Sequence, residues 1–500
     1  MQAPLTGSAA RRPRHWALIA ALLAGVVACY VPALPGPYQF DDSIGIAVDP
    51  AAASLSVWWQ APASHVRPLS KASFAVSHGL GERLGHAPMG HRLVNVTIHL
   101  AAIALLWRLA LQLSATCLPR TRARDAAVGA ALAAALFGLH PLATEAVSYL
   151  SGRSMALGTV LAGTCLLAWI RARTLGSRGW SVAALGLAVL AALARESVVF
   201  SIPLLVGAWE LLRRDRSAAH FGASPRAWRA AVPFAAVAVA ALLAMSWHDR
   251  YAELLRMSAW IAQVRRHDAS LITALGYFGG ALSLLRAPTI DPDVSAALSG
   301  ATRWAAGAGL MGLLWWAWRV RERHPQWLLA ALWVLAWLLP LYAWPVRHDV
   351  VSERHFYPAL WGVAWAVGVT LAPALQRGTT DTARAAAVRG AVGTLILVLS
   401  ALTAARNLDY RSEVSLWEAA ERSAPRKVRV LNNLGVAYME AGRWAEAARV
   451  LNRALLLDPQ HGTVPWNLAA ARRRDLGVLR EPVLLDWPQP VHTDTDPAPR

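Results

Sequence analysis

Long apolar runs recur along this 500-residue chain, and they constrain its fold more than any other feature. A helix needs about 20 largely apolar residues to cross a bilayer, and the sequence supplies roughly eleven such windows. They lie at Trp16–Leu34, His91–Leu113, Ala126–Leu139, Met155–Ile170, Trp180–Ala194, Val198–Leu212, Trp228–Trp247, Trp304–Trp318, Trp327–Trp344, Phe356–Leu375 and Gly390–Ala404. Hydrophobic residues make up 56% of the chain and charged residues 16%, against about 45–50% and about 25% in ordinary soluble domains. We therefore predict an all-α protein, a polytopic bundle of membrane helices.

Clusters of arginine alternate between these runs and predict how the bundle is oriented. Cytoplasmic loops collect Lys and Arg, and the clusters that follow this rule begin at Arg11, Arg120, Arg171, Arg213, Arg319 and Arg377. The alternation places the N-terminus in the cytoplasm, with the first run as an uncleaved anchor. It holds only if Leu271–Leu285 does not cross fully, so we expect a re-entrant or interfacial segment there. The loop 35–90 and the region after Ala404 then lie outside.

The basic charge does not predict a nucleic-acid partner. The chain carries 49 Lys+Arg against 30 Asp+Glu, a net charge of +19, but these residues form short clusters between apolar runs, not one polar face. Cys29, Cys117 and Cys165 are too scattered for a disulfide framework or a metal pattern. The sequence also contains no G-x-x-x-x-G-K-[ST] loop and no H-E-x-x-H motif. Cytosolic nucleotide chemistry and a protein metal site are therefore not expected.

A soluble repeat follows the last apolar run. Self-comparison at an offset of about 34 residues aligns a set of packing positions, pairing Trp417 with Leu451, Ala420 with Ala454, Pro425 with Pro459, Asn433 with Asn467 and Leu434 with Leu468. This spacing is typical of tetratricopeptide repeats. We therefore predict a membrane domain at 1–405, a short tetratricopeptide-repeat region at 406–478 and a flexible tail at 479–500. Because one unit cannot bury its apolar face alone, the repeat should lean on the membrane domain.

Two adjacent carboxylates, Asp41 and Asp42, follow the first apolar run on the predicted outer face. Ionisable residues at membrane depth mark functional sites by default. A neighbouring negative charge raises the pKa of one carboxyl, which keeps it basic enough to take a proton from a hydroxyl group. The pair is thus a candidate general base, and a turn-forming role or cation binding are the alternatives.

Further polar groups lie at the outer ends of other apolar runs. A turn carries His140 and Glu145 and leads to Arg153, and a later one carries Arg195–Glu196. These groups are candidates for one outer-face site. The alternatives are a helix–helix turn with interfacial charges and a simple ion pair.

Outer arginines are candidates for binding an anionic lipid headgroup. Arg354, which follows Glu353 at the start of an apolar run, is the first choice because a guanidinium can hold a phosphate bidentately. Arg67 and Arg153 are further cationic candidates. Interfacial snorkelling is the alternative explanation for some of these residues.

Several of these motifs follow one another in a characteristic order. They are Phe40–Asp42, Arg67–Leu69, Asn95–His99, His140–Arg153, Ser352–Pro358 and the C-terminal repeat. Their order and spacing resemble the transmembrane and tetratricopeptide-repeat O-mannosyltransferases, a GT-C glycosyltransferase group. The resemblance implies that the bundle predicted above, with about 11 spans plus one re-entrant segment, is GT-C-like. It also implies a transferase that moves a sugar, with mannose expected, from a polyprenyl-phosphate carrier to Ser or Thr hydroxyls of exported proteins.

The same resemblance assigns roles to the site residues. Asp42 or Asp41 would be the catalytic base, and the lipid phosphate and donor would meet Arg354, Glu353, Arg153, His140, Glu145, Arg67 and Arg195. Because phosphate is a fair leaving group, a base and cationic stabilisation could suffice without a metal or other cofactor. The expected partners are the lipid-linked sugar, membrane lipids and an exported acceptor docked by the repeat, with a bacterial inner membrane as the location and the repeat in the periplasm. A lipid-linked oligosaccharide ligase, a non-enzymatic assembly protein and a transporter are the alternatives.

Overall fold

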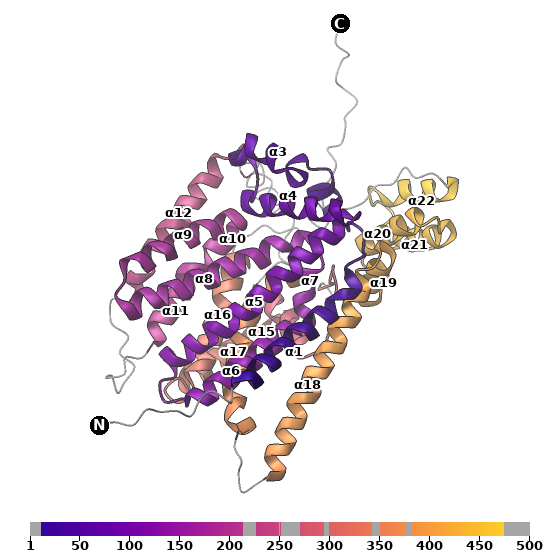
Figure 1. The fold of residues 1–500 in the computed structure, drawn as a ribbon. Helices are drawn as coiled ribbons and strands as arrows, with labels where there is room; N and C mark the ends of the chain where they lie inside the picture. Colours follow the sequence, from indigo (N-terminus) through magenta and orange to yellow (C-terminus); the bar gives the residue numbers. More distant parts are fainter. Residues whose placement is uncertain are drawn as a thin grey trace, which may run out of the picture.

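The computed structural model describes residues 12–213, 227–249, 251, 271–294, 300–342, 351–376 and 382–474. All regular elements in this part of the chain are helical and none is a strand, which confirms the all-α prediction. Long helices form a bundle, and shorter helices near the C-terminus stand at one end of it (Figure 1). The predicted tail at 479–500 lies outside the described residues.

The helices have the following bounds: α1 (Arg12–Tyr30), α2 (Pro50–Ala53), α3 (Leu55–Gln60), α4 (Pro68–Arg83), α5 (Ala87–Cys117), α6 (Ala123–Gly138), α7 (Thr144–Val147), α8 (Arg153–Leu175), α9 (Arg178–Ala194), α10 (Glu196–Val199), α11 (Ser201–Leu212), α12 (Val232–Trp247), α14 (Leu271–Leu282), α15 (Gly300–Arg319), α16 (Pro325–Tyr342), α17 (Ala359–Gln376), α18 (Thr382–Asp409), α19 (Glu413–Ser423), α20 (Val428–Glu440), α21 (Trp444–Leu457) and α22 (Val464–Arg473). Short 3-10 turns include η2 (Val31–Ala33), η5 (Pro141–Ala143), η6 (Leu150–Gly152) and η8 (Glu353–His355).

Each predicted apolar run contains a helix, but the helices differ in length. Among the described residues, five are long and apolar enough to cross a membrane, or six if the bent pair Ala123–Gly138 and Pro141–Val147 is one span. The pair bends by 61°, where Pro141 cannot continue the hydrogen bonding of α6. Several shorter apolar helices accompany them. Several membrane helices are thus confirmed, and the number eleven stays a prediction. The re-entrant segment also stays a prediction. The 12 residues of α14 span about 18 Å at 1.5 Å per residue, which is shorter than the bilayer core of about 30 Å.

A contact between helix ends brings two of the predicted cytoplasmic clusters together. Glu210 at the end of α11 accepts from Arg173 at 2.8 Å and from Arg213 at 2.8 Å. At the junction of α6 and α17, Gln376 donates to Asp125 at 2.9 Å. The clusters at Arg171 and Arg213 therefore meet through Glu210 where α8 and α11 end, and the orientation of the bundle stays a prediction.

Glycines allow α6 and α17 to cross at close range. A methyl group on Gly368 would lie 2.3 Å from the carbonyl oxygen of Gly129 and 3.0 Å from the backbone nitrogen of Ala133. No side chain fits in that gap, so the two helices touch through their backbones. Close backbone packing of this kind drives helix association in membranes, where lipid is as apolar as the side chains.

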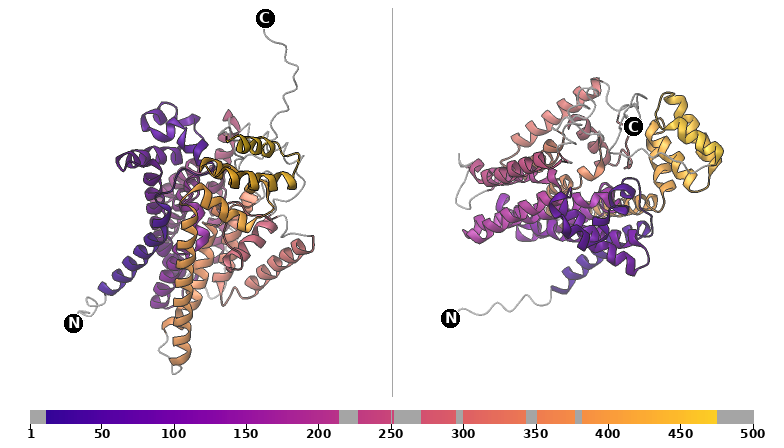
Figure 2. Two further views of the ribbon diagram at one scale, coloured as in Figure 1. Left: turned by 90° about the vertical axis from the view of Figure 1, so that its right-hand side faces the viewer. Right: turned by 90° about the horizontal axis from the view of Figure 1, so that it is seen from above.

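The repeat region forms helical hairpins that share a core with the membrane domain. Gly435 on α20 lets Leu451 of α21 pack against the backbone, since a methyl group at Gly435 would lie 2.5 Å from Leu451 Cγ. The same buried cluster includes Phe40, Tyr149 and Ile290 from the membrane domain. The short repeat therefore leans on the bundle, and α18 runs into it without a break at residue 405 (Figures 1 and 2).

Candidate active site

Residues 39–42, called the acidic segment below, follow η2 at the end of the bundle that carries the repeat region. The side chain of Asp42 is completely buried, and Asp41 is 9% exposed. Asp42 Oδ1 accepts from the backbone N–H of Ser151 at 2.9 Å and from its hydroxyl at 2.7 Å. Asp42 Oδ2 accepts from the backbone N–H of Gln39 at 3.3 Å. The loop that carries Asp42 is thus joined to η6, which lies within the predicted motif His140–Arg153.

Burial changes the acid strength of this carboxyl group. Desolvation raises the pKa of Asp42 to about 7, although the hydrogen bonds from Ser151 and Gln39 and the charge of Arg92 favour the ionised form. A carboxylate with a pKa near the working pH accepts a proton more readily than an exposed aspartate, and it is still ionised in a useful fraction of molecules. The geometry therefore suits Asp42 to general base chemistry.

Arg92, which the sequence did not single out, hydrogen-bonds to the backbone that precedes the acidic segment. Its guanidinium donates to the carbonyl oxygen of Pro37 at 2.6 Å, to that of Ser148 at 3.3 Å and also to that of Gly36. The side chain is 1% exposed. A charged residue near the start of an apolar helix is costly unless it has partners, so Arg92 could have been singled out from the sequence as a site residue.

Glu145 and Arg354, from two separate motifs, form a buried ion pair. Arg354 Nη1 lies 2.8 Å from Glu145 Oε1, and the backbone N–H of Arg354 donates to Glu145 Oε2 at 3.1 Å. Ser352 donates to the same carboxylate at 2.6 Å. The guanidinium carbon of Arg354 lies 5.6 Å from the centre of the Tyr149 ring, a ring whose electrostatic neighbours also include Asp41 and Asp42. The arginine predicted first for phosphate binding is therefore close to the acidic pair.

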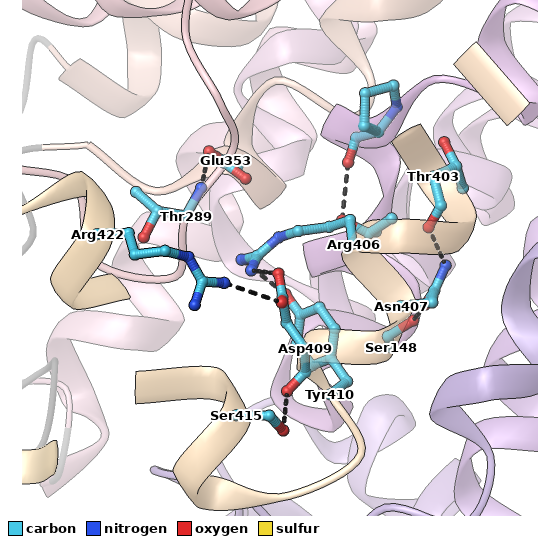
Figure 3. Close-up of polar contacts among 12 residues, drawn as sticks. Ser148, Thr289, Glu353, Thr403, Arg406, Asn407, Asp409, Tyr410, Ser415 and Arg422 are labelled. Carbon is cyan, nitrogen blue, oxygen red and sulfur yellow. Dashed lines mark hydrogen bonds and ion pairs between the residues drawn. The ribbon is translucent and has the colours of Figure 1, made fainter. Parts of the chain in front are cut away.

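Glu353 lies in the same buried region and faces Arg406. It accepts from the Tyr277 hydroxyl and from the backbone N–H of Thr289 at 2.7 Å. Within the described residues, no group donates to its Oε2 atom. Desolvation raises the pKa of Glu353 to about 8, with the charge of Arg406 opposing that rise. Figure 3 shows the Arg406 side chain extending between Glu353 and Asp409; its Nη1 is 2.8 Å from Asp409 Oδ2.

Arg153, a predicted phosphate ligand, is bonded on all sides by protein acceptors. Its Nε atom donates to Asn95 at 2.5 Å, Nη1 to Ser77 at 2.8 Å, and Nη2 to the carbonyl of His91 at 2.7 Å. The guanidinium also stacks over the Phe74 ring at 3.9 Å. The Arg153 side chain thus joins α8 to α4 and α5.

Arg67 and Arg195 lie on the side of the site formed by α4 and α10. Arg67 is bidentate to Glu196, at 2.8 Å and 2.6 Å, and it adopts a left-handed backbone conformation with φ of 55°. Arg195 donates to Ser154 at 2.9 Å. The partner that holds Glu196 bidentately is thus the distant Arg67 and not the adjacent arginine.

His140 occupies the break between α6 and η5. Its Nδ1 atom accepts from the backbone N–H of Leu142 at 3.2 Å and so caps the turn. The side chain is 5% exposed. In the part of the chain that the structure describes, no group of three or more His, Cys, Asp or Glu residues could hold a metal ion.

Two comparisons relate this chain to known proteins. The tetratricopeptide-repeat family model matches residues 428–461, which confirms the repeat. The chain is also 34% identical over 149 residues to a protein O-mannosyl-transferase, Tmtc1 of Drosophila melanogaster. That similarity covers 29% of this chain, which spans only 15% of the length of the fly protein. The chain is thus similar, over part of its length, to a protein O-mannosyl-transferase.

Proposed function

We propose that this chain is a membrane glycosyltransferase that moves a sugar, mannose in the first instance, from a polyprenyl-phosphate carrier to Ser or Thr hydroxyls of exported proteins. The observation that carries the proposal is the buried Asp42 carboxyl, which has a pKa of about 7 and is held by Ser151. Arg354 contacts the Tyr149 ring, which also lies within electrostatic range of Asp42. The partial similarity to a protein O-mannosyl-transferase supports the same reaction.

In the proposed reaction, Asp42 takes the proton of the acceptor hydroxyl as its oxygen attacks the anomeric carbon of the sugar. A new carbon–oxygen bond forms on one face while the bond to the lipid phosphate breaks on the other, so the anomeric configuration inverts. The lipid phosphate leaves with the bonding electrons. We assign Arg354 the role of stabilising its developing charge, because a guanidinium fixed by Glu145 needs no reorganisation during the reaction.

The remaining predicted residues divide by the partners they contact. Glu353 and His140 shape the buried face near Arg354, whereas Arg153 and Arg67 hold helices in place through bonds to other protein groups. Asp41 flanks the base, and we assign it the second place in the acidic pair. The proposal gives no role to a metal, and it places the site and the repeat region in the periplasm of a bacterial inner membrane.

The test is quantitative glycoproteomics of the exported fraction from cells that carry the wild type, a deletion or Asp42→Asn. The matched control is Asp49→Asn, because Asp49 is in the same outer loop but pairs with Lys71 and caps α2. We expect Ser/Thr-linked hexose to fall at least about 100-fold in Asp42→Asn, in the range for loss of a general base, and to persist in the control.

Membrane abundance of each variant is measured in parallel, so that loss of protein is not read as loss of chemistry. Linked glycans larger than a single hexose would identify an oligosaccharide donor. Unchanged glycosylation in both the deletion and Asp42→Asn would refute the transferase proposal and leave the assembly role to be tested.

A further inference from the structure

The acidic segment is bonded directly to the first helix of the repeat region. The side-chain amide of Gln39 donates to the carbonyl oxygens of Tyr410 at 3.0 Å and Ser412 at 3.3 Å. The backbone N–H of Phe40 donates to Glu413 Oε1 at 2.9 Å. These residues are more than 370 positions apart in the sequence, so the contact exists only when the repeat is docked.

Glu413 is itself oriented by the helix that carries it. Its second oxygen, Oε2, accepts from the indole N–H of Trp417 one turn later at 2.9 Å. The Trp417 ring then packs edge-on against Phe40, with 5.0 Å between the ring centres and an interplanar angle of 85°. One carboxylate therefore joins the Phe40 backbone to the ring that contacts the Phe40 side chain.

Phe40 needs such support because its backbone is strained. Its φ of 56° lies in the left-handed region, which is unfavourable for a bulky residue and persists only where surrounding contacts enforce it. The conformation sets the direction in which the chain enters Asp41 and Asp42. Gly36 adds to the fit, since a methyl group there would lie 2.2 Å from the carbonyl oxygen of Tyr410.

We propose that Glu413 is a positioning residue for the acidic pair and that the repeat region is a structural part of the active site. By holding Phe40 in its left-handed conformation, Glu413 keeps Asp42 in reach of Ser151. The claim that Glu413 serves a catalytic base rests on the proposed function, whereas the claim that it positions Phe40 and Asp42 does not. Undocking of the repeat would release the acidic segment and switch off the base.

The first test is hydrogen–deuterium exchange of the full-length protein in lipid nanodiscs, followed over residues 39–45. Glu413→Ala removes the acceptor for the Phe40 N–H, and we expect exchange in this segment to rise about tenfold or more. Glu413→Gln keeps one acceptor oxygen for two donors and should give an intermediate rise. The control is Glu446→Ala on α21, where the carboxylate pairs with Arg443 at the surface, and it should leave the segment unchanged.

If Glu413→Ala does not fold, the same measurement is made on Trp417→Phe, which keeps an aromatic ring but removes the N–H donor to Glu413 Oε2 together with the second ring of the indole. A smaller rise in exchange is then expected. Unchanged exchange over 39–45 in every folded variant would overturn the positioning role, whatever the protein catalyses.

The second test is transfer activity with polyprenyl-phosphate mannose and the acceptor found by glycoproteomics. A positioning role predicts that Glu413→Ala lowers kcat at least tenfold with the donor KM unchanged, and that Glu413→Gln recovers part of the loss. Released exchange without loss of kcat would show that Glu413 does not serve the base. Retained activity in Asp42→Asn would instead count against the proposed function, so the two failures are distinguishable.

Discussion

Burial gives Asp42 a pH dependence that an exposed aspartate would not have. Its pKa is raised to about 7 because the carboxylate is cut off from water. Only the ionised form can take a proton, so we expect kcat/KM to rise about tenfold per pH unit below pH 7 and to level off above it. The measurement is a pH–rate profile of the full-length enzyme between pH 5 and pH 9.

The matched variant for this profile is Ser151→Ala, which removes the hydroxyl bond to Asp42 and leaves the backbone bond in place. Because both bonds favour the ionised carboxylate, the rising limb should move to higher pH in this variant. A profile that stays flat from pH 5 to pH 7 would exclude Asp42 as the titrating base.

Residue types alone predicted which side chains belong to this region, but not which of them pair with one another. Asp42, Glu145 and Arg354 stand out because charge is rare at membrane depth. Arg153 carries the same signal, yet its donors are taken up by Asn95, Ser77 and His91. That distinction depends on how α4, α5 and α8 pack, which no local pattern records. Arg406 at the end of the last span was an equally visible charge that the motif reasoning passed over.

At the scale of the helix, the crossing of α6 and α17 depends on the absence of side chains. A methyl group on Gly368 would overlap backbone atoms of Gly129 and Ala133, which cannot move aside as a flexible side chain could. We expect Gly368→Ala to destabilise the protein by about 1–3 kcal/mol, the usual cost of overpacking. The measurement is thermal unfolding in detergent, followed by intrinsic tryptophan fluorescence.

Gly393 in α18 provides the control for this substitution. No atom lies within 4 Å of a methyl group placed there, so Gly393→Ala should not destabilise the protein and should gain up to about 1 kcal/mol from the higher helix propensity of alanine. Equal effects at the two glycines would mean that helix propensity, and not close packing, determines the result. The apolar pattern predicted both helices, but the glycines that set their separation are ordinary residues until the partner helix is known.

At the scale of the whole molecule, a second contact fastens the repeat region to the bundle. Asp291, in the segment after α14, is 3% exposed. It accepts from Arg429 at 2.5 Å and 2.8 Å and from Lys427 at 2.5 Å. The neighbouring Thr289 is bonded to Glu353, so this segment connects the repeat to the buried face of the candidate site. The sequence predicted that a short repeat would lean on the bundle, but contacts across more than 130 residues were beyond its reach.

Removing Asp291 should therefore loosen both the repeat and the segment that contacts Glu353. Burial by itself would raise the pKa of Asp291, but Arg429 and Lys427 outweigh that effect and hold the pKa below its ordinary value of 3.8. A carboxyl with a lowered pKa stabilises the docked state fully at neutral pH, and this contribution is lost as the pH falls below about 4. In Asp291→Ala at pH 7, the buried Arg429 and the partly exposed Lys427 lose their partner, at a cost of about 3 kcal/mol or more. Hydrogen exchange over residues 286–294 and over α20 should rise strongly.

The surface pair of Glu421 and Arg453 is the control, because Glu421→Gln should cost under about 1 kcal/mol and leave both segments protected. Equal protection in the wild type and Asp291→Ala would show that the core around Phe40 and Trp417 docks the repeat without this ion pair.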